Sequence, residues 1–450
     1  MDLPPPCPPV LRPLMSEQRR ISANILWLLG EKLLRLGVSF AIIGLLARHL
    51  GPESFGALLY SAGLAALFTA LANLGLDTVV VQELVRHPAE APAILGTAFG
   101  LRLLGALLAM VALAAAAPWL TNGQAALLPL VAIAGFGLLT QAFEVIDLWF
   151  QQKLQSRHTV LAKLGALTAG SAVKLWLIAR AAPVVWFAWA LVLDGLLFGL
   201  ALVAVYRAQR ERITGWKFSA AIARRLLRTS WPLVTAGLLV AFYLRLDQVL
   251  VLYQLGLREL GFYSAAVKVS DIWVAVCAMV LTSIFPPLAA RHGADSGRFA
   301  RDLQFAFDAM TGLGYAVAVF ISLTATLLVP LVFGEGYRDT ALVLAVLAWN
   351  APFLFSGGVR AHYLMLENLT VYHNAVVVLG LAANVLLAFW LIPRWGAPGA
   401  ALAAVVSYAL SGWVSSLFFP RLQACGRMQT TALLLPLRPQ AWAEIYRRLR

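Results

Sequence analysis

Twelve long apolar runs divide the sequence of 450 residues and limit what it can fold into more than any other feature. Each run reaches the roughly 20 residues with which a helix crosses the hydrocarbon core of a bilayer. The spans must be helices, because lipid offers no partners to backbone N–H and C=O groups. The expected spans are 21–47, 54–82, 92–119, 124–150, 158–180, 183–206, 231–253, 260–289, 304–333, 340–365, 369–392 and 397–419.

The composition points the same way. Apolar residues make up 61% of the chain and charged residues 12%, against about 45–50% and about 25% in soluble domains. These values exclude a soluble enzyme, a disordered chain and a secreted disulfide scaffold. The three cysteines, Cys7, Cys277 and Cys425, lie far apart, so we expect no metal site, no disulfide framework and no cofactor.

The basic residues predict the topology. With the N-terminus placed inside, 22 of the 35 Lys and Arg residues fall in inner loops and tails, 5 in outer loops and 8 inside spans. Basic loops stay on the cytoplasmic side of a membrane. We therefore expect a multi-pass protein of the bacterial inner (plasma) membrane with both termini cytoplasmic. The net charge of +14 then reflects topology, and no nucleic acid partner is expected.

The predicted fold class is all-α, with two pseudo-symmetric six-helix lobes around a central cavity. The expected parts are a cytoplasmic N-terminal tail (1–20), an N-lobe (21–206), a linker (207–230), a C-lobe (231–420) and a basic cytoplasmic C-terminal tail (421–450). The first 20 residues lack the short apolar core of a signal peptide. A short internal sequence repeat supports the division into two halves, because Leu50–Gly56 aligns with Leu255–Gly261 at an offset of 205 residues.

The linker and the C-terminal tail both combine cations with apolar residues at helical spacing. In the linker, Trp216, Phe218, Ile222 and Leu226 recur beside Lys and Arg residues. This pattern is typical of an amphipathic helix that lies on the cytoplasmic leaflet and binds membrane lipids. The tail around Trp442 has the same pattern.

Among the ionisable residues inside the expected spans, fifteen charged ones are the most informative. Each costs at least about 2.5–3.5 kcal/mol at mid-bilayer unless it is paired or faces water, so the sequence predicts a wet interior cavity. They are Glu31, Lys32, Arg35, Asp77, Arg102, Glu144, Asp147, Lys163, Lys174, Asp194, Arg245, Asp247, Lys268, Asp271 and Arg360.

The cations in this set suit an anionic head group, above all a phosphate or diphosphate. Arg245 and Lys268 lie deepest, and Arg102 and Lys174 are further candidates for substrate binding. The acids could carry H⁺ or Na⁺, or hold the cations in place when the cavity is empty, and the sequence leaves both roles open. The candidates for ion coupling or charge pairing are Glu31, Asp77, Asp247 and Asp271. Glu144, Asp147, Lys163 and Arg360 lie near inner span ends and are expected to reach the interface.

Several motifs resemble the polysaccharide (O-antigen type) flippases of the multidrug/oligosaccharidyl-lipid/polysaccharide exporter (MOP) superfamily. The residues that carry the resemblance are Ala47–Gly56, Ala72–Asp77, Glu83–Arg86, Arg245–Leu250, Leu260–Lys268 and Pro286-Pro287-Leu288. The resemblance implies that spans one, two, seven and eight line a cavity that opens alternately to each side. It also implies that cations of this cavity correspond to Arg35, Arg245 and Lys268. Many relatives have fourteen spans, whereas twelve are expected here.

The resemblance further implies a substrate and a role. The substrate would be a polyprenyl-diphosphate-linked oligosaccharide, translocated for the biosynthesis of O-antigen lipopolysaccharide, capsule or exopolysaccharide. Glycan polymerase machinery is a possible contact. A transporter of this kind is not an enzyme, and the sequence has no G-x-x-x-x-G-K-[ST], D-x-D or H-E-x-x-H motif.

Three other functions stay open at this point. The first is an ion-coupled drug or cation antiporter of the same superfamily, whose cavity should favour acids and aromatic residues. The second is a membrane-embedded glycan polymerase or ligase, against which the short outer loops argue. The third is an assembly scaffold that transports nothing and does not need its intramembrane charges.

Overall fold

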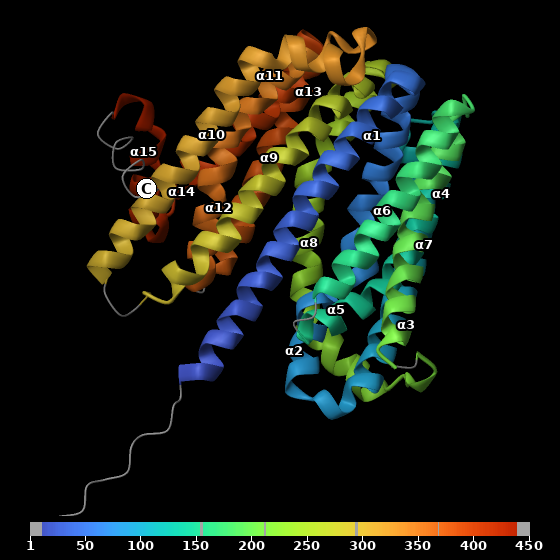
Figure 1. Cartoon of the computed structure of the whole chain (residues 1–450). Helices are drawn as coiled ribbons and strands as arrows, with labels where there is room; N and C mark the ends of the chain where they lie inside the picture. Colours follow the sequence, from blue (N-terminus) through green and yellow to red (C-terminus); the bar gives the residue numbers. More distant parts are fainter. Residues whose placement is uncertain (1–10, 154–155, 211–212, 293–295, 368, 439–450) are drawn as a thin grey trace, which may run out of the picture.

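The computed structural model describes residues 11–153, 156–210, 213–292, 296–367 and 369–438, and this part of the chain is nearly all helical (Figure 1). The predicted all-α class is confirmed. The helices are α1 (Leu11–Asn73), α2 (Leu76–Arg86), α3 (Ala91–Leu120), α4 (Leu128–Thr140), α5 (Val145–Gln152), α6 (Ser156–Ala179), α7 (Val184–Ala208), α8 (Ala220–Leu255), α9 (Leu257–Ala289), α10 (Ser296–Phe333), α11 (Thr340–Leu347), α12 (Ala351–Leu366), α13 (Thr370–Ala409), α14 (Ser415–Phe418) and α15 (Gln423–Leu433).

Ten continuous stretches of the described chain are long and apolar enough to cross a membrane. Two of them, 34–86 with 53 residues and 371–418 with 48, exceed the roughly 20 residues that one crossing needs. Each contains a glycine with non-helical backbone angles, Gly51 at φ 71° and Gly396 at φ 62°. A chain that turns at these glycines crosses twice in each stretch, which is compatible with the twelve predicted spans.

Large apolar side chains cover the outward faces of these helices. Leu323, Leu327 and Leu331 of α10 are 68–77% exposed, and Leu386 of α13 is 72% exposed. In water such surfaces would drive aggregation, whereas in a bilayer they face acyl chains at little cost. The chain is therefore a multi-pass membrane protein.

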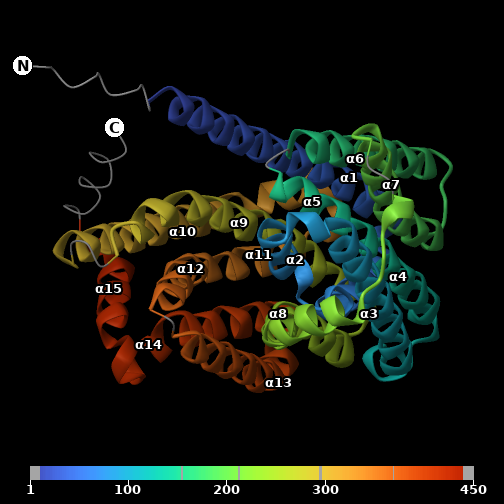
Figure 2. The ribbon, with the colours of Figure 1, turned by 90° about the horizontal axis from the view of Figure 1, so that it is seen from below.

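The helices form two groups. Seen from below in Figure 2, α2 to α7 gather on one side and α9 to α15 on the other, with α1 and α8 lying along the boundary. Figure 1 shows the two groups meeting at its upper end, where the turn from α8 to α9 and the turn from α10 to α11 lie. These turns belong to the loops that the sequence places outside, and we call this end the outer end. Toward the opposite, inner end the groups spread apart.

The short internal sequence repeat lies at this outer contact. Gly51 and Gly256 occupy the same position in the two copies, and both have positive φ, 71° and 85°, where only glycine is free of strain. Gly56 and Gly261 also correspond, and their backbones touch each other. A Cβ atom built on Gly56 would lie 2.6 Å from the Cα of Gly261. The repeat therefore provides two of the turns and a close backbone contact between the halves.

The linker differs in one respect from its prediction as a separate helix on the leaflet. Residues from Ala220 onward form the start of α8, which continues through Pro232 to Leu255. Ile222 and Leu226 are 8% and 0% exposed, because they pack against the inner half of the N-lobe and not against lipid. Trp216 also packs against this cluster, whereas Phe218 is 62% exposed, so the amphipathic pattern is satisfied largely but not wholly within the protein. The predicted amphipathic tail around Trp442 lies outside the described residues.

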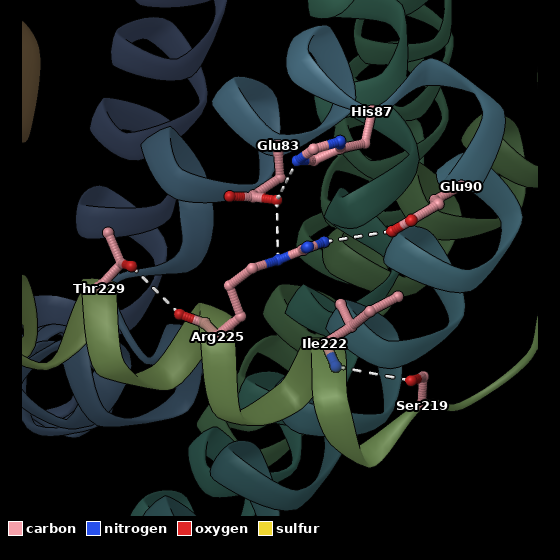
Figure 3. A network of polar contacts seen from close by, with 7 residues as sticks. All are labelled: Glu83, His87, Glu90, Ser219, Ile222, Arg225 and Thr229. Carbon is pink, nitrogen blue, oxygen red and sulfur yellow. Dashed lines mark hydrogen bonds and ion pairs between the residues drawn. The ribbon is translucent and has the colours of Figure 1, made fainter.

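A polar network holds the start of α8 on the N-lobe (Figure 3). The Arg225 guanidinium bridges two acids, with 3.0 Å from its Nε to Glu83 and 3.3 Å from its Nη2 to Glu90. Ser219 caps the helix by accepting a hydrogen bond from the Ile222 backbone N–H. The helix that begins the C-lobe is therefore anchored to the N-lobe at its inner end.

The glycine contact yields a stability prediction. A Cβ on Gly261 would lie 2.0 Å from the Pro52 carbonyl oxygen, so Gly261→Ala forces backbone to move. Overpacking of this kind costs about 1–3 kcal/mol, and we expect a lower thermal unfolding midpoint in detergent. Gly165→Ala is the matched control, because a Cβ there meets nothing within 4 Å and alanine favours a helix. Equal midpoints for the two variants would contradict the proposed contact.

Candidate functional site

A cavity of about 300 Å³ lies between the two lobes, below the glycine contact. Helix α1 contributes Ser39, Ile42 and Leu46, which recur at spacings of three and four and so share one helical face. Helices α6 and α7 add further N-lobe walls, while α8 and α9 form the C-lobe side. The charged residues that line it are Lys174, Asp194, Arg245 and Lys268.

The C-lobe side of the cavity holds two cations around one carboxylate. Asp271 Oδ2 lies 3.2 Å from Lys268 Nζ and 3.7 Å from Arg245 Nη2. The side chains of Arg245 and Lys268 are 23% and 30% exposed, so water reaches both. Two cations that share one acid leave an excess positive charge that faces the cavity.

The N-lobe side holds a third cation. Lys174 of α6 forms a hydrogen-bonded ion pair with Asp194 of α7, and both residues line the cavity. The two residues are 20 positions apart on neighbouring helices. Cations from both lobes therefore converge on one chamber, and the sequence analysis had named Lys174, Arg245 and Lys268 but not Asp194 as site residues.

Arg35 is placed differently. Its side chain is exposed and does not line the cavity. It lies four residues before Ser39, on the same face of α1 and one turn nearer the inner end. Arg35 is thus positioned at the inner mouth of the chamber. The side chain of Glu31 lies outside the described part of the structure.

Arg102 and Asp77 pair with each other away from the cavity. The Arg102 side chain is 1% exposed and forms an ion pair with Asp77, whose side chain is 59% exposed. Its second contact is to the Gln141 carbonyl oxygen at 3.5 Å. Neither residue lines the central cavity. This arrangement brings together two residues that the sequence analysis had considered for separate roles.

Asp247 faces a second, much smaller pocket of about 70 Å³ inside the C-lobe. It accepts hydrogen bonds from the Tyr263 hydroxyl and from the Gln248 backbone N–H. Asp271 lines the same pocket, together with Asn350 and Asn384. Asp271 therefore stands between the C-lobe pocket and the two cations of the central cavity. No group of three His, Cys, Asp or Glu residues suited to a metal ion occurs in the described ranges.

Uncharged polar residues of the cavity escaped the sequence analysis. Gln248, Ser171 and Ser264 line it and are almost wholly shielded from solvent. An uncharged polar side chain costs much less in a span than an ionised one, so its presence there points less strongly to a cavity. The position of Gln248 directly after Asp247 in a resembling motif was the one available signal.

At the outer end the lobes are joined by side chains as well as glycines. The Arg48 guanidinium donates to the carbonyls of Leu331 and Val332, at 3.1 Å for the latter, and the Tyr337 hydroxyl donates to the Ala47 carbonyl at 3.1 Å. Burial raises the pKa of Tyr337, which keeps this donor protonated. Arg48, which belongs to the Ala47–Gly56 motif, therefore has a structural role here.

Comparison with known proteins decides the family. A family model described as "Polysaccharide biosynthesis protein" matches residues 45–342, about two thirds of the sequence. The chain belongs to this polysaccharide biosynthesis family. The resemblance drawn from the sequence motifs is thereby confirmed. Among curated proteins, none matches the sequence significantly.

Solved structures give the fold. An inward-facing multidrug resistance MATE family transporter of the MOP superfamily matches with a TM-score of 0.70 and 15% identity. The match covers 88% of the present chain and 95% of the transporter. The lipid II flippase MurJ, in an inward closed conformation, also gives 0.70, at 12% identity over 94% and 97% of the two chains. A MOP superfamily transporter from Pyrococcus furiosus gives 0.62 at 16% identity, over 92% and 95%. The present chain therefore has the fold of the MOP transporters.

The Lys174–Asp194 pair yields a prediction of its own. Lys174→Met leaves Asp194, whose side chain is 34% exposed, without its counter-charge, and loss of such a partly solvated ion pair should cost about 0.2–1 kcal/mol of unfolding free energy. The double variant Lys174→Met/Asp194→Asn removes both charges and should recover most of this loss. Thermal unfolding in detergent measures both. If the single and double variants unfold at the same temperature, the pair does not stabilise the site.

Proposed function

We propose that this protein is a flippase that translocates a polyprenyl-diphosphate-linked oligosaccharide across the bacterial inner membrane by alternating access. The observation that carries the proposal is the convergence of Lys174 from one lobe with Arg245 and Lys268 from the other on a single cavity. A site built from both lobes is taken apart when the lobes rock, so its affinity can differ between the two sides of the membrane. The role would be in making a surface polysaccharide such as O-antigen, capsule or exopolysaccharide.

The charge of the cavity favours an anionic head group. Three cations and one acid line it, and with Asp271 counted a net charge of +1 remains. Amines and guanidinium groups bind phosphate oxygens by charge-assisted hydrogen bonds. The cations would also replace the water molecules that hydrate a diphosphate. Without such a replacement, the free-energy cost of moving the diphosphate through hydrocarbon is prohibitive.

The size of the cavity limits what it encloses. About 300 Å³ is at the lower end of ligand pockets, which run from about 300 to 1,000 Å³. The chamber therefore suits the diphosphate and its nearest sugar. We propose that the polyprenyl tail stays in lipid between the lobes and that the rest of the glycan lies toward the inner mouth, near Arg35.

The structure also bears on direction. The outer end is closed by Arg48, Tyr337 and the Gly56–Gly261 contact, while the lobes spread apart toward the inner end (Figure 1). We propose that this is the inward-open state, which loads substrate from the cytoplasmic leaflet. Both termini would then be cytoplasmic.

The rival functions fit the cavity less well. A drug or cation antiporter needs an excess of acids where this cavity has an excess of cations. A glycan polymerase or ligase needs catalytic groups at the outer face, which here consists of short turns. A scaffold gives no reason for three cations to converge on one chamber.

Transport should fail when the C-lobe cations are removed. We expect Arg245→Ala combined with Lys268→Ala to abolish flipping of a fluorescent undecaprenyl-diphosphate-linked sugar in proteoliposomes, because the diphosphate loses two of its three cations. Arg394→Ala is the control, since Arg394 is exposed and bonds its own helix at the Trp390 carbonyl. Undiminished flipping by the double variant would refute the site.

Asp271 should compete with the diphosphate for Arg245 and Lys268. Half-exposed ion pairs are worth about 0.2–1 kcal/mol each, so Asp271→Asn should tighten binding of a short-chain polyprenyl diphosphate by about 2- to 30-fold. Turnover should fall, because the internal anion no longer helps to release the substrate. Calorimetric titration and the flipping assay measure the two effects, with Asp302→Asn as the control, since Asp302 pairs with Arg291 and does not line the cavity. Weaker binding would show that Asp271 only supports the fold.

A further inference from the structure

The N-lobe encloses a second chamber, of about 290 Å³, between α1, α4 and α7. Leu58, Ala62, Ala66 and Leu191 line both this chamber and the central cavity, so the two share a wall. The function proposed above does not use the N-lobe chamber. Its polar lining consists of Ser61, Thr69, Thr140, Gln141 and Glu144.

Two of these residues are held together by the local backbone. Residues Gln141–Glu144 form a 3₁₀ segment between α4 and α5. In a 3₁₀ helix the side chains at positions i and i+3 are eclipsed, so Gln141 and Glu144 lie on the same face. An interruption of this kind inside a span often marks a functional position.

The charges around Glu144 leave it without a counter-charge. The charged groups that interact with it electrostatically are Arg102 of α3, Asp77 of α2, Asp147 of α5 and Lys163 of α6. Arg102 is paired with Asp77, and Lys163 lies 3.0 Å from Asp147. Helix α7 adds only Ala188, Leu191, Val192 and Gly195 to the chamber, and α1 adds no charged residue. Within the described chain, Glu144 is therefore an excess negative charge inside the membrane, which is costly.

The amide of Gln141 completes the arrangement. Its Nε2 donates to the Thr69 hydroxyl at 3.4 Å, which fixes the orientation of the side chain. Its Oε1 is buried and has no hydrogen-bond partner among the described residues. An amide oxygen only accepts hydrogen bonds, as an ionised carboxylate does, whereas a protonated carboxyl group has an O–H to donate. The protonated form of Glu144 thus suits this chamber better than the ionised form.

A proton fits the chamber better than a metal cation. A hard cation such as Ca²⁺ takes about six to eight oxygens at about 2.3–2.6 Å, which requires a tight cage. The N-lobe chamber is far larger, and most of its wall is Ala, Leu, Val and Gly. A proton needs only the carboxyl oxygen that binds it and one acceptor.

We propose that Glu144 is a proton-binding site and that Gln141 and Thr69 position it. Protonation removes the excess charge from the N-lobe without movement of any neighbouring ion pair. If the chain is the flippase proposed above, on which this step rests, the proton bound at Glu144 is the one whose gradient drives transport. None of the acids that the sequence analysis considered for coupling, namely Glu31, Asp77, Asp247 and Asp271, is required for this role.

Chemical modification tests the binding of the proton without any substrate. Dicyclohexylcarbodiimide reacts with protonated carboxyl groups in apolar surroundings, and mass spectrometry of the digested full-length protein locates the adduct. In proteoliposomes we expect Glu144 to be modified to an extent that falls as the pH is raised. Asp147, three residues further along, is ion-paired with Lys163 and should stay unmodified. Absence of an adduct at Glu144 at any pH, or its suppression by Na⁺ at constant pH, would overturn the assignment.

Transport tests the coupling. Flipping of the fluorescent lipid-linked sugar by the wild type should accelerate under an imposed pH gradient, and Glu144→Gln should reduce this to the rate without a gradient. Glu53→Gln, at an exposed outer position, should respond as the wild type does. A Glu144→Gln protein that still responds to the gradient, or a wild type that ignores it, overturns the coupling role. If the wild type does not flip the probe at all, it is the proposed function that fails, while the carbodiimide result still decides the proton site.

Discussion

The cost of placing an ionised group away from water governs this molecule. Most of its described intramembrane charges are met by a partner on another helix, as in Arg102 with Asp77 and Lys163 with Asp147. Hydrophobic burial cannot distinguish one helix from another in lipid, since acyl chains are as apolar as leucine. These pairs therefore select which helices lie together. Where the pairing is incomplete, around Asp271 and at Glu144, the structure contains a cavity.

The arrangement of the helices makes the central cavity sensitive to the position of the lobes. Its cations come from α6 on one side and from α8 and α9 on the other. Helix α8 belongs to both lobes, because Arg225 holds its inner end on the N-lobe while its outer half lines the cavity. A movement of either lobe therefore shifts Arg245 relative to Lys174. The proposed binding site is therefore made of residues that the proposed lobe movement would displace.

Much of the fold and part of the candidate site could be predicted from the sequence. The rest depends on how the helices pack, which a sequence pattern does not contain. Apolar length gave the spans, and the intramembrane charges gave Lys174, Arg245 and Lys268. The pairing of Lys174 with Asp194 could not be foreseen, because it depends on how α6 packs on α7. The resemblance implied that Arg35 is a cation of the cavity, but a motif carries no information on where a cavity ends, and the Arg35 side chain is not part of the lining. Glu144 resembled a residue that reaches the interface, and only the surrounding ion pairs show that it has no counter-charge.

The backbone contact of Gly56 with Gly261 has a consequence for leakage. Dispersion forces weaken steeply with distance, so a gap of only about 0.5–1 Å forfeits a quarter to a half of the attraction. A seal made by two bare backbones has no long side chains that could stretch to span such a gap. The Gly56–Gly261 contact therefore closes the outer end only when the two backbones touch. A transporter closed in this way passes abruptly from one state to the other, and so spends little time in a half-open form through which ions could escape.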